Sequence, residues 1–72
     1  MTNTVLLEAR IAESGMMKKA IAQKLGLSAY GFAKKVSGQS DFKTEEVRVL
    51  CSLLGITSLK EKEDIFFAEK VD

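Results

Sequence analysis

The feature that most constrains this chain is its pattern of breaks. The 72 residues include no proline, and glycines stand at the ends of short segments with apolar periodicity. The four glycines that do this are Gly15, Gly26, Gly38 and Gly55. A glycine just after an apolar periodic stretch is a common end of a helix. The chain is therefore expected to be all-α, with short helices joined by short turns.

Apolar spacing places the helices. Val47, Leu50, Cys51 and Leu54 follow the i, i+3, i+4, i+7 pattern of one helix face. Thr44 is the expected N-cap of that helix, because Glu45 and Glu46 follow where the helix dipole favours acids. The spacing predicts a compact bundle of five short helices, over residues 4–14, 17–25, 28–37, 44–54 and 59–67. A capping box of Ser58 and Glu61 is expected to open the last one.

Composition excludes several function classes. A chain of this length makes one domain, residues 1–72. It has no histidine, and its one cysteine, Cys51, falls on an apolar helix face. We therefore expect no metal site, no cofactor, no catalytic residues and no small-molecule substrate. A lone cysteine fits a reducing cytoplasm, and no apolar run is long enough to span a membrane. The expected protein is cytoplasmic, is not an enzyme and does not contact membranes.

One segment, residues 17–37, has the spacing of a helix-turn-helix. Ala22 is a small residue four positions before Gly26, where two helices must cross closely. Gly26 suits the left-handed turn, Leu27 suits the core, and Ser28 is the expected N-cap of the second helix. Phe32 then falls four residues after Ser28 and is expected to point inward.

These residues resemble the lambda-repressor-like helix-turn-helix of phage Cro and CI repressors and of the broader XRE group of regulators. The stretch "GLSAYGFAKKVSGQSDFKTEEVRVLCSLLGI", followed by "DIFFAEKV", is similar to small Cro-like proteins of phages and prophages of low-GC Gram-positive bacteria. The resemblance covers residues from about 5 to 71. It implies a DNA-binding bundle of five helices, a pseudo-palindromic operator and a homodimer.

Two positions depart from the pattern of the wider family. Lys18 stands where glutamine is common, and a lysine at this position can still contact a phosphate. Lys35 stands where an apolar residue is usual, and Val36 is expected to take the core role because it follows Phe32 by four residues.

A helical projection with Phe32 inward gives the outer face of the third helix. The residues expected to read bases are Ser28, Ala29, Tyr30, Ala33 and Lys34. Lysine typically contacts guanine, and tyrosine can use its hydroxyl or contact a thymine methyl. Two alternatives stay open. Tyr30 could cap the edge of the core, and Gly31 could serve packing rather than close approach to DNA.

Charge is concentrated on the same part of the chain. Residues 16–43 hold six lysines and one acid, a local charge of +5, and the whole chain carries +1, so the remainder carries −4. This distribution suits a DNA-binding face, although lysine clusters on short helices are commonly just solvated. The expected phosphate contacts are Lys18, Lys19, Lys35, Ser37, Gln39 and Lys43.

The C-terminal segment, residues 59–72, is the expected dimerisation segment. Ile65, Phe66 and Phe67 are consecutive, and one helix face cannot bury all three in a small core. We expect Phe66, Phe67 and Val71 at a homodimer interface, with a short extended segment after the last helix as one way to pair. In the alternative, the phenylalanines fold back onto their own chain.

Together these observations predict a sequence-specific regulator of transcription that binds double-stranded DNA, most similar to a Cro-type repressor. The chain leaves no room for the second domain of full-length CI repressors, which favours the Cro-like interpretation. The alternative is an adaptor or antirepressor that keeps the same helical fold and binds protein through its third helix.

Overall fold

The computed structural model describes residues 1–68, which form five α-helices and no strand. The helices are α1 (Thr4–Ser14), α2 (Lys18–Lys24), α3 (Ala29–Val36), α4 (Thr44–Leu54) and α5 (Leu59–Phe66). The prediction of a compact bundle of five short helices is confirmed. Within the described residues, none of these helices has the length and apolar character needed to cross a membrane.

Side-chain caps fix where most of the helices begin. Asn3 Oδ1 accepts the N–H of Leu6 at 3.1 Å and starts α1. Ser28 Oγ accepts the N–H of Gly31 at 3.0 Å and starts α3, as expected from the sequence. The four expected glycines all have positive φ, so each break lies where the sequence indicates it.

Two expected caps differ in detail. The expectation that Thr44 caps α4 is wrong by one residue, because Lys43 is the N-cap and the Glu46 carboxylate accepts its N–H at 2.9 Å. Ser58 does cap α5, through Glu61 N–H at 3.3 Å. The Glu61 carboxylate, however, lies 3.4 Å from Arg10 Nε rather than returning to the cap.

The core is formed by buried apolar residues from all five helices and by Ile56, which follows α4. Phe32, Leu7, Ile21, Leu50 and Ile65 are its largest fully buried side chains. Phe42 lies at its edge and meets Phe32 and Phe66 edge-on, with ring centroids 6.1 Å and 5.7 Å apart. Cys51 is buried in this core, as predicted.

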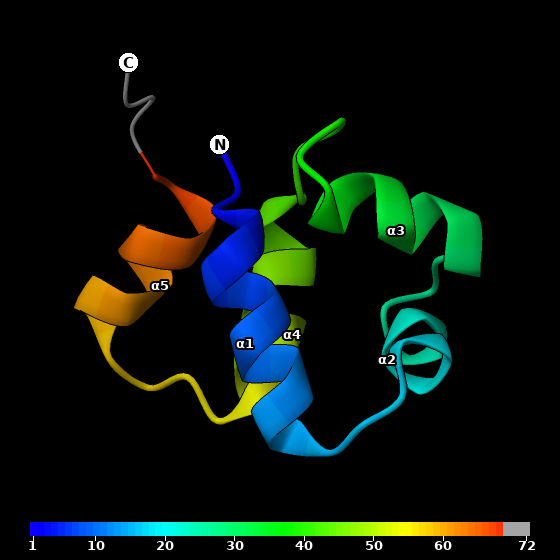
Figure 1. Ribbon diagram of the computed structural model, residues 1–72, viewed down its shortest axis with the longest axis horizontal. Coiled ribbons are helices and arrows are strands. Elements are labelled where there is room, and N and C mark those ends of the chain that lie inside the picture. Colours follow the sequence, from blue (N-terminus) through cyan, green and yellow to red (C-terminus); the bar gives the residue numbers. More distant parts are fainter. Residues whose placement is uncertain (69–72) are drawn as a thin grey trace.

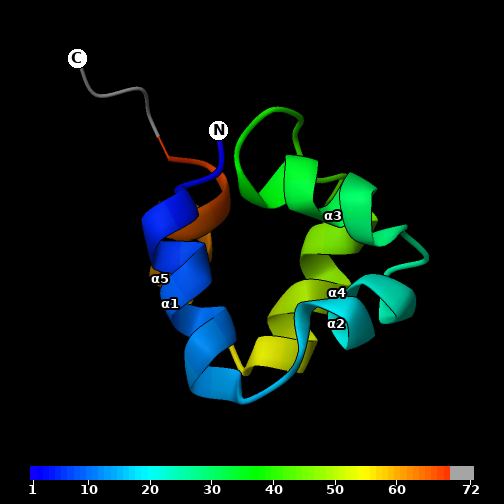
Figure 2. The same ribbon diagram turned by 45° about the vertical axis from the view of Figure 1, so that its right-hand side comes forward.

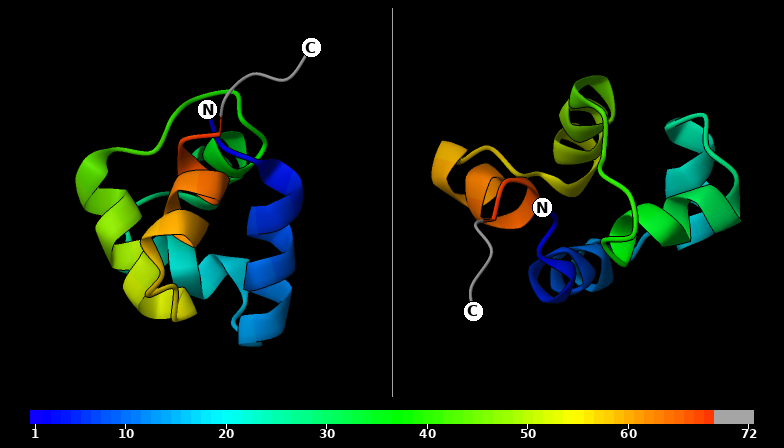
Figure 3. Two further views of the ribbon diagram at one scale, coloured as in Figure 1. Left: turned by 90° about the vertical axis from the view of Figure 1, so that its left-hand side faces the viewer. Right: turned by 90° about the horizontal axis from the view of Figure 1, so that it is seen from above.

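Helix α1 is the centre of the arrangement. It packs against α3, α4 and α5, while α2 packs against α3 and α4 (Figures 1 and 2). The pair α2–α3 lies at one end of the long axis and α5 at the other (Figure 3). The N-terminal segment is tied to α5, since Asn3 N–H donates to the Ile65 carbonyl at 2.6 Å.

The consecutive phenylalanines are divided between core and surface. Phe66 is 5% exposed and Ile65 is 1% exposed, whereas Phe67 is 56% exposed. Phe66 thus folds back onto its own chain, as in the alternative, and this corrects the expectation that it is available for a dimer interface. Val71 and the expected extended segment around it lie outside the described residues.

Candidate nucleic-acid interface

The turn between α2 and α3 sets the angle at which α3 leaves the body of the protein. Gly26 has φ of +73°, and the next residue, Leu27, donates its N–H to the Ala22 carbonyl at 2.9 Å. Ala22 is 1% exposed, so a larger side chain would collide with the crossing helix. The roles expected of Ala22, Gly26 and Ser28 in this turn are all found.

Helix α3 is held from behind by its own apolar residues and by α1. Phe32 and Val36 are both buried, which confirms their predicted orientation. Thr4 Oγ1, at the start of α1, donates to the Val36 carbonyl at 2.8 Å. This bond satisfies a carbonyl at the C-terminal end of α3, where the helix itself offers no donor.

We call the solvent side of this helix the α3 outer face, made up of Ala29, Tyr30, Ala33, Lys34 and Ser37. Tyr30 is 74% exposed, so it does not cap the core edge. Lys34 Nζ lies 5.7 Å from the centroid of the Tyr30 ring, a cation–π distance. Ala29 and Ala33 are exposed, and their short side chains let a partner approach the helix backbone closely.

Gly31 supports the cap of α3 rather than the core. A Cβ built at Gly31 would lie 3.1 Å from Ser28 Oγ, and no core side chain lies within 4 Å of it. Any side chain here would therefore press on the hydroxyl that caps the helix. Ser28 itself is exposed and uses its hydroxyl for that bond.

The lysines around the α3 outer face are not equivalent. Lys19 and Lys43 are exposed and, within residues 1–68, have no acidic partner within ion-pair distance. Lys18 is paired, because its Nζ lies 2.8 Å from Glu8 Oε1. Ser37 and Gln39 are exposed at the end of α3.

Lys35 differs from the expectation that it contacts a DNA phosphate. Its side chain is 13% exposed and its Nζ lies 2.5 Å from Oε1 of Glu46, whose side chain is 11% exposed. Burial alone would raise the pKa of Glu46, but hydrogen bonds from Lys35 and from the Lys43 N–H outweigh burial and hold that pKa below its usual value. Lys35 thus joins α3 to the start of α4, and in this structure it is not available to a phosphate.

Three of the elements enclose a depression at the edge of the α3 outer face, with a volume of about 160 Å³. Thr4 and Glu8 come from α1, Lys18 and Lys19 from α2, and Ala29, Phe32, Ala33, Val36 and Ser37 from α3 and its cap. We call it the Glu8 depression. Thr4 and Glu8 in this depression, and Glu46 beside Lys35, could not be predicted from the sequence, because their partners are 10 or more residues away and no local pattern marks the pairs.

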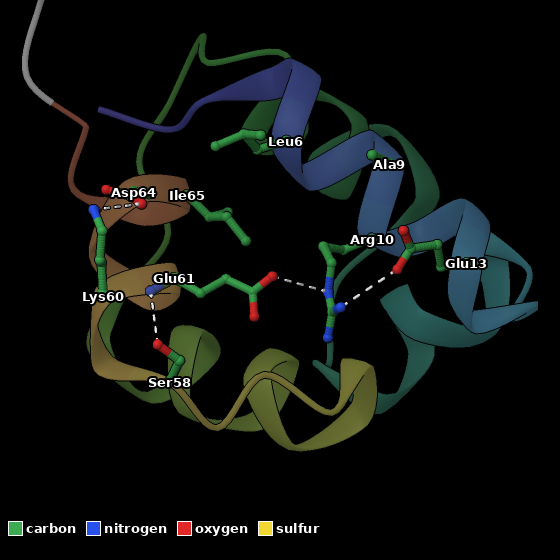
Figure 4. Close-up of a pocket in the computed structure, with 9 residues that line it drawn as sticks. All are labelled: Leu6, Ala9, Arg10, Glu13, Ser58, Lys60, Glu61, Asp64 and Ile65. Carbon is green, nitrogen blue, oxygen red and sulfur yellow. Dashed lines mark hydrogen bonds and ion pairs between the residues drawn. The ribbon is translucent and has the colours of Figure 1, made fainter.

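A larger hollow of about 440 Å³, which we call the α1–α5 cleft, lies on another part of the molecule (Figure 4). Leu6, Ala9 and Ile65 supply its apolar wall, and Arg10 projects between α1 and α5. Arg10 donates to the Leu54 carbonyl at 2.9 Å and pairs with Glu13 at 3.3 Å, so its guanidinium already has partners within the protein. No group of three possible metal ligands occurs in the described part of the chain.

Comparison of the chain with protein-family models, with curated proteins and with solved structures found no match.

Proposed function

We propose that this protein is a sequence-specific regulator that binds double-stranded DNA by placing α3 in the major groove. The observation that carries the proposal is the α3 outer face, which combines the short side chains of Ala29 and Ala33 with Tyr30, which is 74% exposed, and the partly exposed Lys34 beside it. A major groove about 12 Å wide admits one helix, and short side chains at its edges allow close approach.

The proposed base contacts come from Tyr30 and Lys34, with Ser28, Ala29 and Ala33 close to the bases. The Lys34 ammonium suits guanine O6 and N7, and the Tyr30 ring suits a thymine methyl group. The two side chains lie side by side, with Lys34 Nζ 5.7 Å from the centroid of the Tyr30 ring, so they can contact neighbouring bases.

The proposed phosphate contacts surround this pair. Lys19, Lys43, Ser37 and Gln39 are exposed, and Lys18 can reach a phosphate once it leaves Glu8. Such contacts give affinity and register but no sequence information. Lys35 is withdrawn from this set, because its ion pair with Glu46 positions α3 instead.

The resemblance to lambda-repressor-like regulators supports the same proposal and suggests which kind of regulator this is. The connected helices α2 and α3 have the order and turn of a helix-turn-helix, and the proposed role is that of a Cro-like repressor of a phage or prophage. It would act in the cytoplasm by covering a promoter. The proposal includes no cofactor and no catalytic step.

The proposed DNA-binding form is a homodimer on a pseudo-palindromic operator, because one α3 reads too few base pairs for tight specific binding. Phe66 does not contribute to the proposed interface, since it is in the core. Large apolar side chains are exposed on and beside α1 and α5, namely Met1, Val5, Leu6, Leu59 and Phe67. This concentration supports a dimer surface near the α1–α5 cleft.

Fluorescence anisotropy with a site selected from a random duplex library tests the proposal. At about 150 mM salt, the selected site should bind at least about 10³-fold more tightly than random duplex. Lys19→Ala should weaken both, and it should reduce the slope of log K against log salt by about 0.9. Lys62→Ala on α5, which removes the same charge, is the matched control and should change neither. Equal binding to both duplexes would refute the proposal.

The alternative from a different class is an adaptor or antirepressor that binds protein. The α1–α5 cleft favours it, because exposed apolar residues lie on both helices that form it. Tyr30→Ala separates the two functions, because it should impair a DNA-binding regulator and leave unaffected an adaptor that binds protein through this cleft.

A further inference from the structure

Glu8 holds a position that the DNA-binding proposal does not explain. Its carboxylate lies 2.8 Å through Oε1 and 2.9 Å through Oε2 from Lys18 Nζ. Both side chains remain half-exposed, at 43% for Glu8 and 53% for Lys18. A carboxylate is therefore already the partner of the Lys18 ammonium group. Lys18 is the first residue of α2 and lies on the side of the molecule where a phosphate is proposed to bind.

The surroundings of the pair show that Glu8 stands at the edge of the proposed interface. Both residues line the Glu8 depression together with Ala29, Ala33 and Ser37 of the α3 outer face and its cap. Among the described residues that line it, Glu8 is the one acid, facing Lys18 and Lys19. Removing the carboxylate would leave an uncompensated basic pocket beside α3.

We propose that Glu8 is an intramolecular competitor for the DNA phosphate that Lys18 would otherwise bind, and that it thereby limits sequence-independent binding. The inference rests on the proposed function. A carboxylate and a phosphate oxygen offer the same acceptor chemistry to an ammonium group, so only one of them at a time is the close partner of Lys18.

The exchange is energetically feasible because the ion pair is exposed to solvent. Exposed pairs of this kind change an equilibrium by about five-fold at most, so a phosphate fixed close to Lys18 can displace Glu8. In a specific complex, base contacts fix the register and bring such a phosphate to one place. On random duplex no register is fixed, and the Glu8–Lys18 pair persists.

Glu8→Gln tests this mechanism, because it keeps the shape of the side chain and removes its charge. Random duplex should bind about two- to five-fold more tightly to the variant. The slope of log K against log salt should steepen by about 0.9, because one more phosphate is contacted. The selected site should gain less, so the specificity ratio should fall. Glu8→Ala should give the same direction, and circular dichroism should show unchanged helix content.

Two controls distinguish competition for Lys18 from a general loss of negative charge. Glu63→Gln removes the same charge from an exposed position on α5 and should leave both affinities unchanged. In a Lys18→Ala background, Glu8→Gln should lose most of its effect. An unchanged salt slope, an equal gain with Glu63→Gln, or an equal gain without Lys18 would overturn the inference.

The experiment also separates this inference from the proposed function. Wild-type protein with no preference for any selected site would refute the proposed function. A clear wild-type preference that Glu8→Gln leaves unaltered on both duplexes would refute the role of Glu8 alone.

Discussion

Gly26 is the single residue on which the angle between α2 and α3 depends most directly. Its φ is +73°, and a Cβ there would meet nothing within 4 Å. Gly26→Ala should therefore destabilise the protein purely through the left-handed backbone, by about 1–2 kcal/mol. Urea unfolding followed by circular dichroism measures this. A neutral or stabilising Gly26→Ala would contradict the left-handed turn.

Cys51 is a core residue with a poorly reactive thiol. Burial raises its pKa, Lys62 opposes this shift, and Glu61 adds to it. A raised thiol pKa and a buried sulfur both suppress the thiolate that reacts. Labelling with a disulfide reagent at neutral pH should be at least about ten-fold slower in the folded protein than in denaturant. Equal rates would show that Cys51 is exposed.

At the scale of elements, the ion pair between Lys35 and Glu46 joins α3 to α4. Neutralising one partner of a pair this buried leaves the ammonium group without a counter-charge. Glu46→Gln should destabilise the protein by about 1–3 kcal/mol. Glu45→Gln, in the same first turn, is the matched control. It removes only a pair with Arg48 in which both side chains are largely exposed, so its effect should be clearly smaller than that of Glu46→Gln. Equal effects in urea unfolding would contradict the account.

The same pair predicts how stability depends on pH. Because the folded pKa of Glu46 is below its usual value of 4.5, its contribution is present above that value and is lost as pH falls through the lowered pKa. Wild-type stability should therefore fall between about pH 5 and pH 3, and Glu46→Gln should fall less steeply. Urea unfolding across this range measures both slopes. Parallel curves for the two proteins would show that Glu46 does not contribute.

At the scale of the whole molecule, the two phenylalanines after Ile65 should have separable effects. Phe66→Leu should destabilise the monomer by about 1–1.5 kcal/mol, because it loses core volume and an edge contact with Phe42. Phe67→Ala should leave monomer stability nearly unchanged and weaken the proposed dimer. Sedimentation with thermal unfolding measures both. A dimer that Phe67→Ala does not weaken would place its interface elsewhere.

The sequence predicts the features that depend on neighbouring residues and misses those that depend on tertiary contacts. Helix ends at Gly15, Gly26, Gly38 and Gly55 follow from local backbone preference, and so does the cap at Ser28. The division of Phe66 from Phe67 does not follow, because it depends on the rotation of α5 against Phe42. The positions of Lys35 and Lys18 were missed for the same reason, since each is set by an acid on a different helix.

Selection of bound sites from a random duplex library, with wild-type protein and Tyr30→Ala in parallel, tests whether α3 reads DNA bases. We expect a two-fold symmetric motif for the wild type. Tyr30→Ala should lose preference at one defined base pair in each half-site, a change of about 1–3 kcal/mol there, while the remaining positions keep theirs. Absence of any enriched motif for the wild type, or an identical motif for Tyr30→Ala, would contradict the claim that α3 reads DNA through this residue.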